Sequence, residues 1–326
     1  MTPAPRPATG AGLLVALTTP FGDDGNVDRG AAEKHAVWLA DHRMDGVIVG
    51  GSLGEGAALS AEERVALVRA VAGAVGSRTS VWAAVAAART SDAVALARAL
   101  GAAGARGLLV LPPYVYRGTP DEVRAHYRAV VGATDRPCLL YNNPPAYGND
   151  LLPEAVLELA EDHPNLVGVK ESGDVRRIAA LRSLLGDSLV LSVGVDDAVV
   201  EGVAGGATGW VAGLANAFPD ESRALFEAAL RGDRPAADAL YRRFLPLLRL
   251  DADPRFVQWI KAVEAEVGLG PAHVRPPRLP LTAPERAHVA ALVAAFRSAG
   301  PSEPAPVQEN SSRSKRASPA AAVRKK

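Results

Sequence analysis

The chain is poor in cysteine, lysine and aromatic residues, and each scarcity narrows the possibilities. A single cysteine, Cys138, among 326 residues permits no disulfide within the chain, as is usual in a reducing compartment. Its apolar neighbours predict a buried thiol. No unbroken apolar run approaches the roughly 18 residues of a membrane span, and residues 1–10 lack the apolar stretch of a signal peptide. We therefore expect a cytoplasmic protein.

The formal net charge is zero, so charge balance indicates neither nucleic acid nor a membrane as a partner. Six basic residues and no acidic one lie in 311–326. Because no aromatic residues are interleaved with them, they favour a solvated, disordered end over a nucleic-acid contact. We predict a flexible Pro-rich leader at 1–11, a catalytic unit at 12–230, a helical part at 231–299 and a disordered basic tail at 300–326.

Short β-prone runs alternate with helices rich in Ala, Leu and Arg. The predicted strands are 13–18, 46–49, 80–85, 107–111, 138–141, 166–169, 189–193 and 209–212. The predicted helices between and after them are 28–42, 60–74, 91–103, 119–132, 153–161, 174–184, 197–204 and 219–230. Eight such units predict a closed α/β barrel, the (β/α)₈ TIM barrel. A doubly wound open sheet is the alternative, which the lack of G-x-G-x-x-G after the first strand disfavours.

Several helix starts carry capping residues. Ser60 with Glu63 forms a capping box, and Ser91 and Thr119 are further N-cap candidates. After residue 230 the alternation gives way to helices near 235–249, 255–267 and 283–298, whose apolar stripes predict packing on the barrel or on a neighbouring subunit. Lys261 lies on the second of these helices, and we expect it to face solvent.

Lys170 ends an apolar predicted strand, in a chain whose positively charged residues are mostly arginines. Only six of the 36 lysines and arginines are lysines, which leaves 30 arginines. Chemistry in a TIM barrel takes place at the C-terminal ends of the strands. Burial there favours a neutral amine, which can form a Schiff base, whereas arginine stays protonated. The alternative is an ion pair between Lys170 and Glu171 or another carboxylate of the rim.

Other chemically distinctive residues fall on the same predicted rim. Tyr141 ends the preceding strand and is placed to transfer protons, unless it is an ordinary amphipathic tyrosine at the barrel edge. The turn GGSLGEG at 50–56 offers backbone N–H groups and the Ser52 hydroxyl to a carboxylate, although such turns also occur without a ligand. Asp196 and Asp197 either bind polar substrate atoms or cap helix 197–204. The six histidines lack metal-ligand spacing, so we predict no metal site.

The motifs GSLGE (51–55), YNNP (141–144) and GVKE (168–171) together resemble those of a known family. This is the class I, Schiff-base-forming aldolase family of dihydrodipicolinate synthase and N-acetylneuraminate lyase, and the resemblance covers about residues 12–298. It implies a (β/α)₈ barrel with a helical C-terminal extension, a homotetramer, and no cofactor. It also implies roles for particular residues: Lys170 forms the Schiff base, Tyr141 transfers protons, and Gly51, Ser52 and Leu53 hold the carboxylate of a 2-oxo acid.

The chain departs from the lysine-pathway synthases of this family at three places. Their paired threonines are Ser52-Leu53 here, their second tyrosine matches Val115, and their arginine after Y-N-x-P is missing from Pro145-Ala146-Tyr147. A buried carboxylate without its partner typically costs a few kcal/mol, so the synthase reaction is disfavoured.

A narrower resemblance is to 1-pyrroline-4-hydroxy-2-carboxylate deaminase, which converts this cyclic imine to 2,5-dioxopentanoate and ammonia. It rests on the stretches 141–150, 194–219, 245–261 and 275–281. Tyr147, Asp196 and Asn216 are then candidates, with Ser52, for steering the substrate hydroxyl. The alternatives are the synthase, another aldolase or dehydratase of the family, and a catalytically silent barrel that acts as a binding protein.

Overall fold

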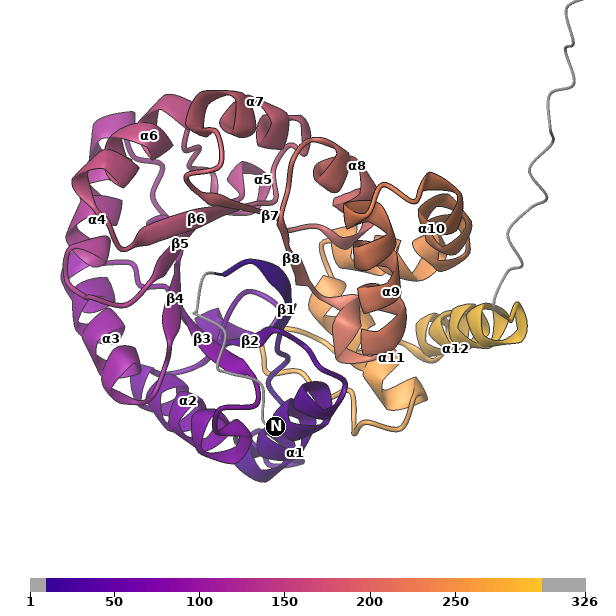
Figure 1. The fold of residues 1–326 in the computed structure, drawn as a ribbon. Helices are drawn as coiled ribbons and strands as arrows, with labels where there is room; N and C mark the ends of the chain where they lie inside the picture. Colours follow the sequence, from indigo (N-terminus) through magenta and orange to yellow (C-terminus); the bar gives the residue numbers. More distant parts are fainter. Residues whose placement is uncertain (1–9, 301–326) are drawn as a thin grey trace, which may run out of the picture.

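A computed structural model describes residues 10–300 and shows a closed barrel of eight parallel strands in the order β1 to β8 (Figure 1). The strands are β1 (Gly12–Ala16), β2 (Gly46–Val49), β3 (Ser80–Val85), β4 (Gly107–Val110), β5 (Cys138–Asn142), β6 (Leu166–Glu171), β7 (Val190–Val193) and β8 (Gly209–Ala212). The predicted TIM barrel is therefore confirmed. Most of the predicted leader and tail lies outside the described residues.

Each strand is buried on both faces, as expected where helices cover a parallel barrel. One set of apolar side chains fills the barrel interior, among them Leu14, Trp82 and Leu139. A Cβ at Gly107 would overlap the Trp82 ring, so that glycine makes room for the indole inside the barrel. A second and larger set packs between the strands and the surrounding helices. The strands are thereby fixed from both sides, and their C-terminal ends have defined positions.

The α-helices alternate with the strands and then continue as a C-terminal group. In chain order they are α1 (Arg29–Asp41), α2 (Ala61–Val75), α3 (Thr90–Ala102), α4 (Pro120–Val131), α5 (Pro144–Tyr147), α6 (Pro153–Asp162), α7 (Arg176–Leu185), α8 (Val199–Ala204), α9 (Pro219–Leu230), α10 (Arg234–Leu248), α11 (Phe256–Glu266) and α12 (Ala283–Ser298). Short 3₁₀ helices η1 (Gly56–Ala58), η2 (Asp196–Ala198), η3 (Leu214–Asn216) and η4 (Arg249–Ala252) lie in the connections. The one-turn helix α5 was not predicted. No described helix is long and apolar enough to cross a membrane.

The capping predictions are confirmed at two of three helix starts. Ser60 and Thr119 both form capping boxes, with Glu63 and Glu122 at the third helical position. The prediction for Ser91 is wrong, because α3 begins at Thr90 and no side chain caps it.

The C-terminal helices gather on one side of the barrel, next to α8 and α9 (Figure 1). Phe218, Phe244 and Phe296 join three segments, with ring centroids 4.7 to 5.9 Å apart. Aromatic pairs at this separation stabilise beyond the area that they bury. The helical part is therefore packed on the barrel through an aromatic cluster, as its apolar stripes predicted.

Lys261 does not face solvent, so that prediction is wrong. Its side chain is 2% exposed, and its Nζ lies 2.5 Å from Glu55 Oε1. Nζ also donates to the carbonyl oxygens of Thr19 and His273, both at 2.7 Å. All three partners lie toward the barrel, so α11 turns its lysine inward.

The carboxylate of Glu55 is the centre of this contact. Glu55 is fully buried, and its Oε2 accepts a hydrogen bond of 3.0 Å from the backbone N–H of Arg275. Its own backbone is left-handed, with φ +53°, a conformation uncommon outside glycine. Contacts from the C-terminal part, at Lys261 and Arg275, thus hold Glu55 within the turn that follows β2.

Replacing Lys261 with methionine removes the hydrogen-bonded cation from the buried Glu55 and leaves Arg278, at 3.7 Å, as its ion-pair partner. Breaking a buried pair typically costs about 3–5 kcal/mol. We expect K261M to lower the free energy of unfolding by that amount in urea denaturation. The exposed Lys34 on α1 gives a matched control, K34M, with little expected change. A loss below about 1 kcal/mol for K261M would show that the pair is not a structural tie.

Candidate active site

Lys170 lies near the C-terminal end of β6 with its side chain 7% exposed. Its Nζ is 4.1 Å from the centroid of the Tyr141 ring, and the two residues are register partners on β5 and β6. Within residues 10–300, Nζ makes no hydrogen bond or ion pair; Glu171, the partner considered from the sequence, is bound elsewhere. The structure therefore presents an amine that is free of a carboxylate at the barrel mouth.

A glycine makes room for the stem of Lys170. A Cβ at Gly194, which follows β7, would lie 2.7 Å from Lys170 Cε and closer still to Ser172 Oγ. Cβ atoms in protein structures essentially never lie within 3.0 Å of such an atom. The glycine that opens the sequence GVDD is thus needed for the position of the lysine.

Tyr141 is buried beside the lysine and is held from two sides. Tyr127 on α4 donates its hydroxyl hydrogen to the Tyr141 carbonyl at 2.8 Å, and Asn143 Nδ2 donates to the phenol oxygen at 3.1 Å. Burial alone would raise the pKa of the phenol. The Lys170 ammonium opposes this, with help from Asn143 and the nearby Ser172 and Ser52 hydroxyls, so the pKa falls below 10. The Ser172 hydroxyl helps to lower this pKa, although it makes no hydrogen bond of ordinary geometry.

Tyr147, on α5, meets Ser52 across the mouth through a short hydrogen bond between their hydroxyls. Its ring stands edge-on to Tyr141 and to Tyr114, with centroids 5.6 and 6.4 Å away. Burial and the neighbouring Tyr141 raise the pKa of the Tyr147 phenol above its ordinary value. The structure therefore brings together four residues singled out from the sequence: Lys170, Tyr141, Ser52 and Tyr147.

The turn after β2 leaves backbone donors unused. Within the described residues the N–H groups of Ser52 and Leu53 donate to no acceptor, whereas Glu55 N donates to Ser52 O at 3.2 Å and Gly56 N to Gly51 O at 2.9 Å. Adjacent free N–H groups with a hydroxyl beside them form a concave site suited to an anion. The turn can therefore take a carboxylate, as the sequence indicated for Gly51, Ser52 and Leu53.

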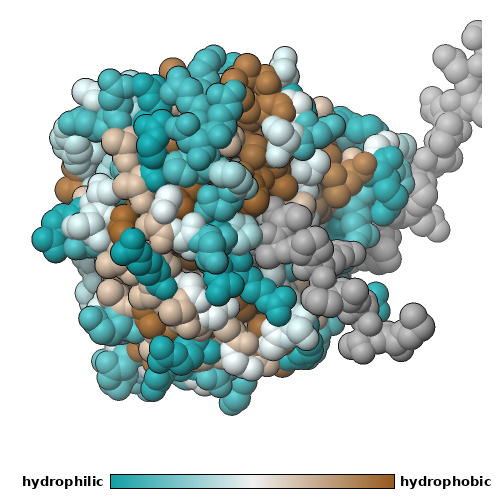
Figure 2. Space-filling view, turned by 60° about the vertical axis from the view of Figure 1, so that its left-hand side comes forward, coloured by the Kyte–Doolittle hydropathy of each residue, from teal (hydrophilic) through white to brown (hydrophobic). Residues whose placement is uncertain are grey.

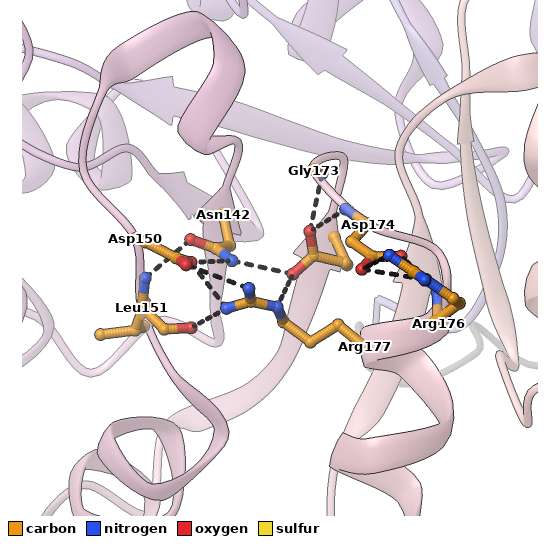
Figure 3. Close-up of polar contacts among 8 residues, drawn as sticks. Asn142, Asp150, Leu151, Gly173, Asp174, Arg176 and Arg177 are labelled. Atoms are coloured by element: carbon orange, nitrogen blue, oxygen red, sulfur yellow. Dashed lines mark hydrogen bonds and ion pairs between the residues drawn. The ribbon is translucent and has the colours of Figure 1, made fainter.

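A polar network behind the mouth joins the two strands that carry Tyr141 and Lys170 (Figure 3). Asn142 Nδ2 donates to Glu171 Oε2 at 2.8 Å, and Gly173 N and Asp174 N donate to Glu171 Oε1 at 2.6 and 3.1 Å. Burial raises the pKa of Glu171, although these hydrogen bonds and Arg177 favour the carboxylate. Arg177 Nε lies 3.8 Å from Glu171 Oε2.

The same network reaches the loop before α6. Arg177 binds Asp150 with both nitrogens, at 2.6 and 3.0 Å, and Leu151 N donates to Asn142 Oδ1 at 2.9 Å. Successive residues of a strand point to opposite sides, so Tyr141 and Lys170 face the mouth while Asn142 and Glu171 bind each other behind them. Sequence analysis missed this network, since nothing in the local pattern pairs an asparagine with a glutamate 29 residues away.

Asp196 and Asn216 are engaged within the protein. Asp196 accepts hydrogen bonds from Trp210 Nε1 at 3.0 Å and Leu214 N at 2.6 Å, and it is fully buried. Asn216 Nδ2 donates to the Ala16 and Gly213 carbonyls, both at 2.8 Å. Neither Asp196 nor Asp197 caps α8, whose N-cap is Ala198. The polar atoms of Asp196 and Asn216 fasten the loops after β7 and β8 and stand apart from the four residues at the mouth.

One carboxyl group at the rim was not anticipated. Asp251, on η4, is half-buried, and its Oδ2 accepts a 3.2 Å hydrogen bond from Asp196 N. The sequence offered no signal for it, because it lies beyond the barrel in the stretch 245–261, which served only as evidence of a family resemblance. Among residues 10–300, no three His, Cys, Asp or Glu side chains cluster in a way that could hold a metal ion.

Comparison with known proteins agrees with this geometry. A model of the Dihydrodipicolinate synthetase family matches residues 9–296. A 4-hydroxy-tetrahydrodipicolinate synthase of Xanthomonas axonopodis pv. citri (strain 306) is 38% identical over 278 residues, which cover 84% of this chain and 90% of the relative.

Solved structures extend the likeness to the fold. The 4-hydroxy-tetrahydrodipicolinate synthase from Methylacidiphilum fumariolicum SolV gives a TM-score of 0.84 at 30% identity, over 88% of this chain and 96% of that one. A dihydrodipicolinate synthase from Acinetobacter baumannii, complexed with pyruvate, gives 0.83 at 29% identity, over 88% and 99%. The chain belongs to the dihydrodipicolinate synthetase family and is an enzyme of its kind, a class I aldolase-type lyase that works through a Schiff base.

Proposed function

We propose that Lys170 forms the Schiff base with a 2-oxo acid, or with a cyclic imine derived from one, and that the turn after β2 holds the carboxylate. The observation that carries this is the amine of Lys170, which no hydrogen bond or ion pair engages and which is buried against Tyr141. Tyr141 packs on Tyr147, whose hydroxyl binds Ser52 in the turn with the free N–H groups. A buried amine without a carboxylate partner is the form that attacks carbonyl and imine carbons.

Of the reactions within this class, we propose deamination of 1-pyrroline-4-hydroxy-2-carboxylate. The supporting observation is the loop after Tyr141, where the exposed Ala146 stands in place of the arginine that the synthases use for a second carboxylate. Neither of the other departures restores that clamp: Leu53 is apolar, and Val115 is 91% exposed with φ +78°. A substrate with one carboxylate suits such a site.

The synthase reaction, which joins pyruvate and aspartate semialdehyde, is the second candidate. The names of the relatives favour it over the deaminase, since the similar proteins reported above are synthases. One structural feature also favours it. Arg278 lies 3.7 Å from Glu55 and close enough to Tyr147 for its charge to act on that phenol, so a cation does stand near the turn.

In the deaminase reaction the amine of Lys170 adds to the imine carbon and the ring C–N bond breaks. This leaves a Schiff base on Lys170 and a primary amine at the far end. Tyr141, as phenolate, removes a proton from the carbon next to the iminium, and the 4-hydroxyl leaves as water. A proton shift converts the amine carbon to an imine. Two hydrolyses then release ammonia and 2,5-dioxopentanoate and regenerate Lys170, with one water consumed overall.

Tyr147 and Ser52 are placed to pass the proton from Tyr141 toward solvent. The Ser52 hydroxyl makes the short hydrogen bond to Tyr147 and also lies close enough to the Tyr141 phenol to lower its pKa. Tyr147, on α5, thus provides a second tyrosine at the mouth, in place of the one that the synthases carry at the position of Val115. We propose Tyr147 as the outer member of the relay.

The homotetramer implied by the resemblance stays a prediction. The described residues include exposed large apolar side chains, with Val115 at 91%, Tyr116 at 56% and Leu279 at 77% exposed. Figure 2 shows apolar areas between hydrophilic ones on one face of the molecule. Apolar groups of this kind are compatible with contacts between copies.

Borohydride treatment in the presence of pyruvate should add the mass of the reduced adduct to the peptide that contains Lys170. K170R keeps the charge but loses the nucleophile, so it should show neither the adduct nor turnover, while K34R on the surface should behave as wild type. An unmodified Lys170 peptide in the wild-type enzyme would rule out the Schiff base and leave a silent binding protein as the interpretation.

Turnover of the two candidate substrates separates the reactions. With 1-pyrroline-4-hydroxy-2-carboxylate we expect ammonia release, because the site accommodates a single carboxylate. With pyruvate and aspartate semialdehyde we expect little product. The reverse result, rapid condensation without ammonia release, would assign the enzyme to the synthase reaction.

Y141F should lower kcat by about 10²–10⁴-fold, because it removes the acid–base group, while still allowing slow trapping of pyruvate on Lys170. Y147F removes the outer hydroxyl of the relay and its hydrogen bond to Ser52 but leaves Tyr141 in place, so it should lower kcat by roughly 3- to 10-fold. Y116F is the matched control, since Tyr116 is exposed and binds Glu122 away from the mouth. Equal kcat values for Y141F and Y116F would exclude Tyr141 as the proton carrier.

A further inference from the structure

Asp251 reaches the rim from outside the barrel. It belongs to η4, between α10 and α11, and Asp196 N donates to its Oδ2 at 3.2 Å. Its Oδ1 accepts no hydrogen bond from the described residues. A Cβ at Gly213, after β8, would lie 2.5 Å from Oδ1, so the carboxylate fills the space that this glycine leaves empty. Asp196 N thus binds one oxygen of the carboxylate, and the other lies against Gly213 with no hydrogen-bond donor among the described residues.

The position of Asp251 relates it to the Schiff-base lysine. Gly194, against which the Lys170 stem packs, precedes Asp196 by two residues, and Asp196 is the donor to Asp251. Burial raises the pKa of Asp251 to about 6, and the nearby Lys170 ammonium opposes that rise. The charge of Lys170 therefore reaches the carboxyl group of Asp251.

The two sides of the mouth differ in chemistry. On the β5 side the rings of Tyr141, Tyr147 and Tyr114 stand edge to edge. On the β7–β8 side lie Gly194 and Gly213, with the carboxylate of Asp251 beyond them. A molecule bonded to Lys170, with its carboxylate in the turn after β2, has tyrosine rings on one flank and an anion on the other.

We propose that Asp251 binds the primary ammonium group freed when the cyclic imine opens on Lys170. Formation of the new C=N bond to Lys170 and cleavage of the ring C–N bond leave an amine at the far end of the substrate. That amine takes up a proton from solvent and pairs, as ammonium, with the available oxygen of Asp251. The proposal rests on the deaminase function and makes Asp251 a residue that selects an amine-bearing substrate.

The pairing has a physical rationale in both directions. A carboxylate facing a cation forms a charge-assisted hydrogen bond, which is stronger than a neutral one. The same carboxylate repels a substrate that carries a second carboxylate at its far end, so it discriminates against that class. The charged or titratable groups around it are Lys170 on β6 and Asp196 and Asp197 on η2, and Arg249 acts on Asp197.

D251N tests the proposal, because the amide keeps the shape of the side chain and removes its charge. We expect kcat/KM for 1-pyrroline-4-hydroxy-2-carboxylate to fall about 10- to 100-fold. Borohydride trapping of pyruvate on Lys170 should be unchanged, since pyruvate has no amine. In wild type, kcat/KM should rise as the pH passes about 6 and Asp251 ionises, and D251N should lack that rise. D253N is the matched control, an exposed aspartate two residues along the same loop.

Each of the other possible results contradicts a particular part of the proposal. If wild type releases ammonia and D251N does so within twofold of it, the role of Asp251 is excluded while the deaminase function stands. If D251N loses trapping of pyruvate along with turnover, Asp251 acts on Lys170 and not on the substrate amine. If wild type releases no ammonia from the imine, the deaminase function fails, and the role of Asp251 fails with it.

Discussion

The ion pair between Lys261 and Glu55 is the contact on which the candidate site depends. Both side chains are buried, at 2% and 0% exposure, and the pair fixes Glu55 in the turn that we propose to hold the substrate carboxylate. The left-handed backbone of Glu55 and the free N–H groups of Ser52 and Leu53 belong to the same seven residues. A strained turn persists only where its surroundings determine it, and here those surroundings come from α11 and the segment after it. The C-terminal part therefore shapes the substrate site without lining most of it.

A second constraint comes from the alternation of side chains along the strands. Tyr141 and Lys170 are register partners facing the mouth, and the next pair, Asn142 and Glu171, binds behind them. Arg177 and Asp150 extend that contact to the helices. The proposed reactive groups and the residues that bind behind them are thus neighbours in the sequence, and their side chains point to opposite sides of the strands. The polar groups on the outer side keep the strand ends at a fixed spacing, which sets the distance between amine and phenol.

The barrel was predictable because strand and helix patterns alternate locally. Lys170 was singled out because lysine is rare in this chain, and its catalytic role stays a proposal. The same rarity applied equally to Lys261, but its place on an amphipathic helix outweighed it, and solvent exposure was predicted wrongly. Lys261 is buried with a partner, Glu55, that lies 206 residues away in the sequence. No local pattern reveals such a contact. Asp251 and the Asn142–Glu171 pair were missed for the same reason. Tyr147 was named from the sequence, yet its contact with Ser52 exists only once the barrel is closed and the loops after β2 and β5 meet at its mouth.

The contacts of Glu55 also bear on the order in which the site is built. Its partners Lys261 and Arg275 lie 206 and 220 residues further along the chain. Contacts between such distant residues carry the largest loop-closure cost, and they form after local helices and neighbouring strands have paired. On a ribosome, the whole barrel up to β8 would have emerged before either partner of Glu55 was available. The turn after β2 is among the first segments synthesised, yet two partners of its Glu55 are among the last, so the contacts that hold it in the folded protein become available only after Lys170 has been made.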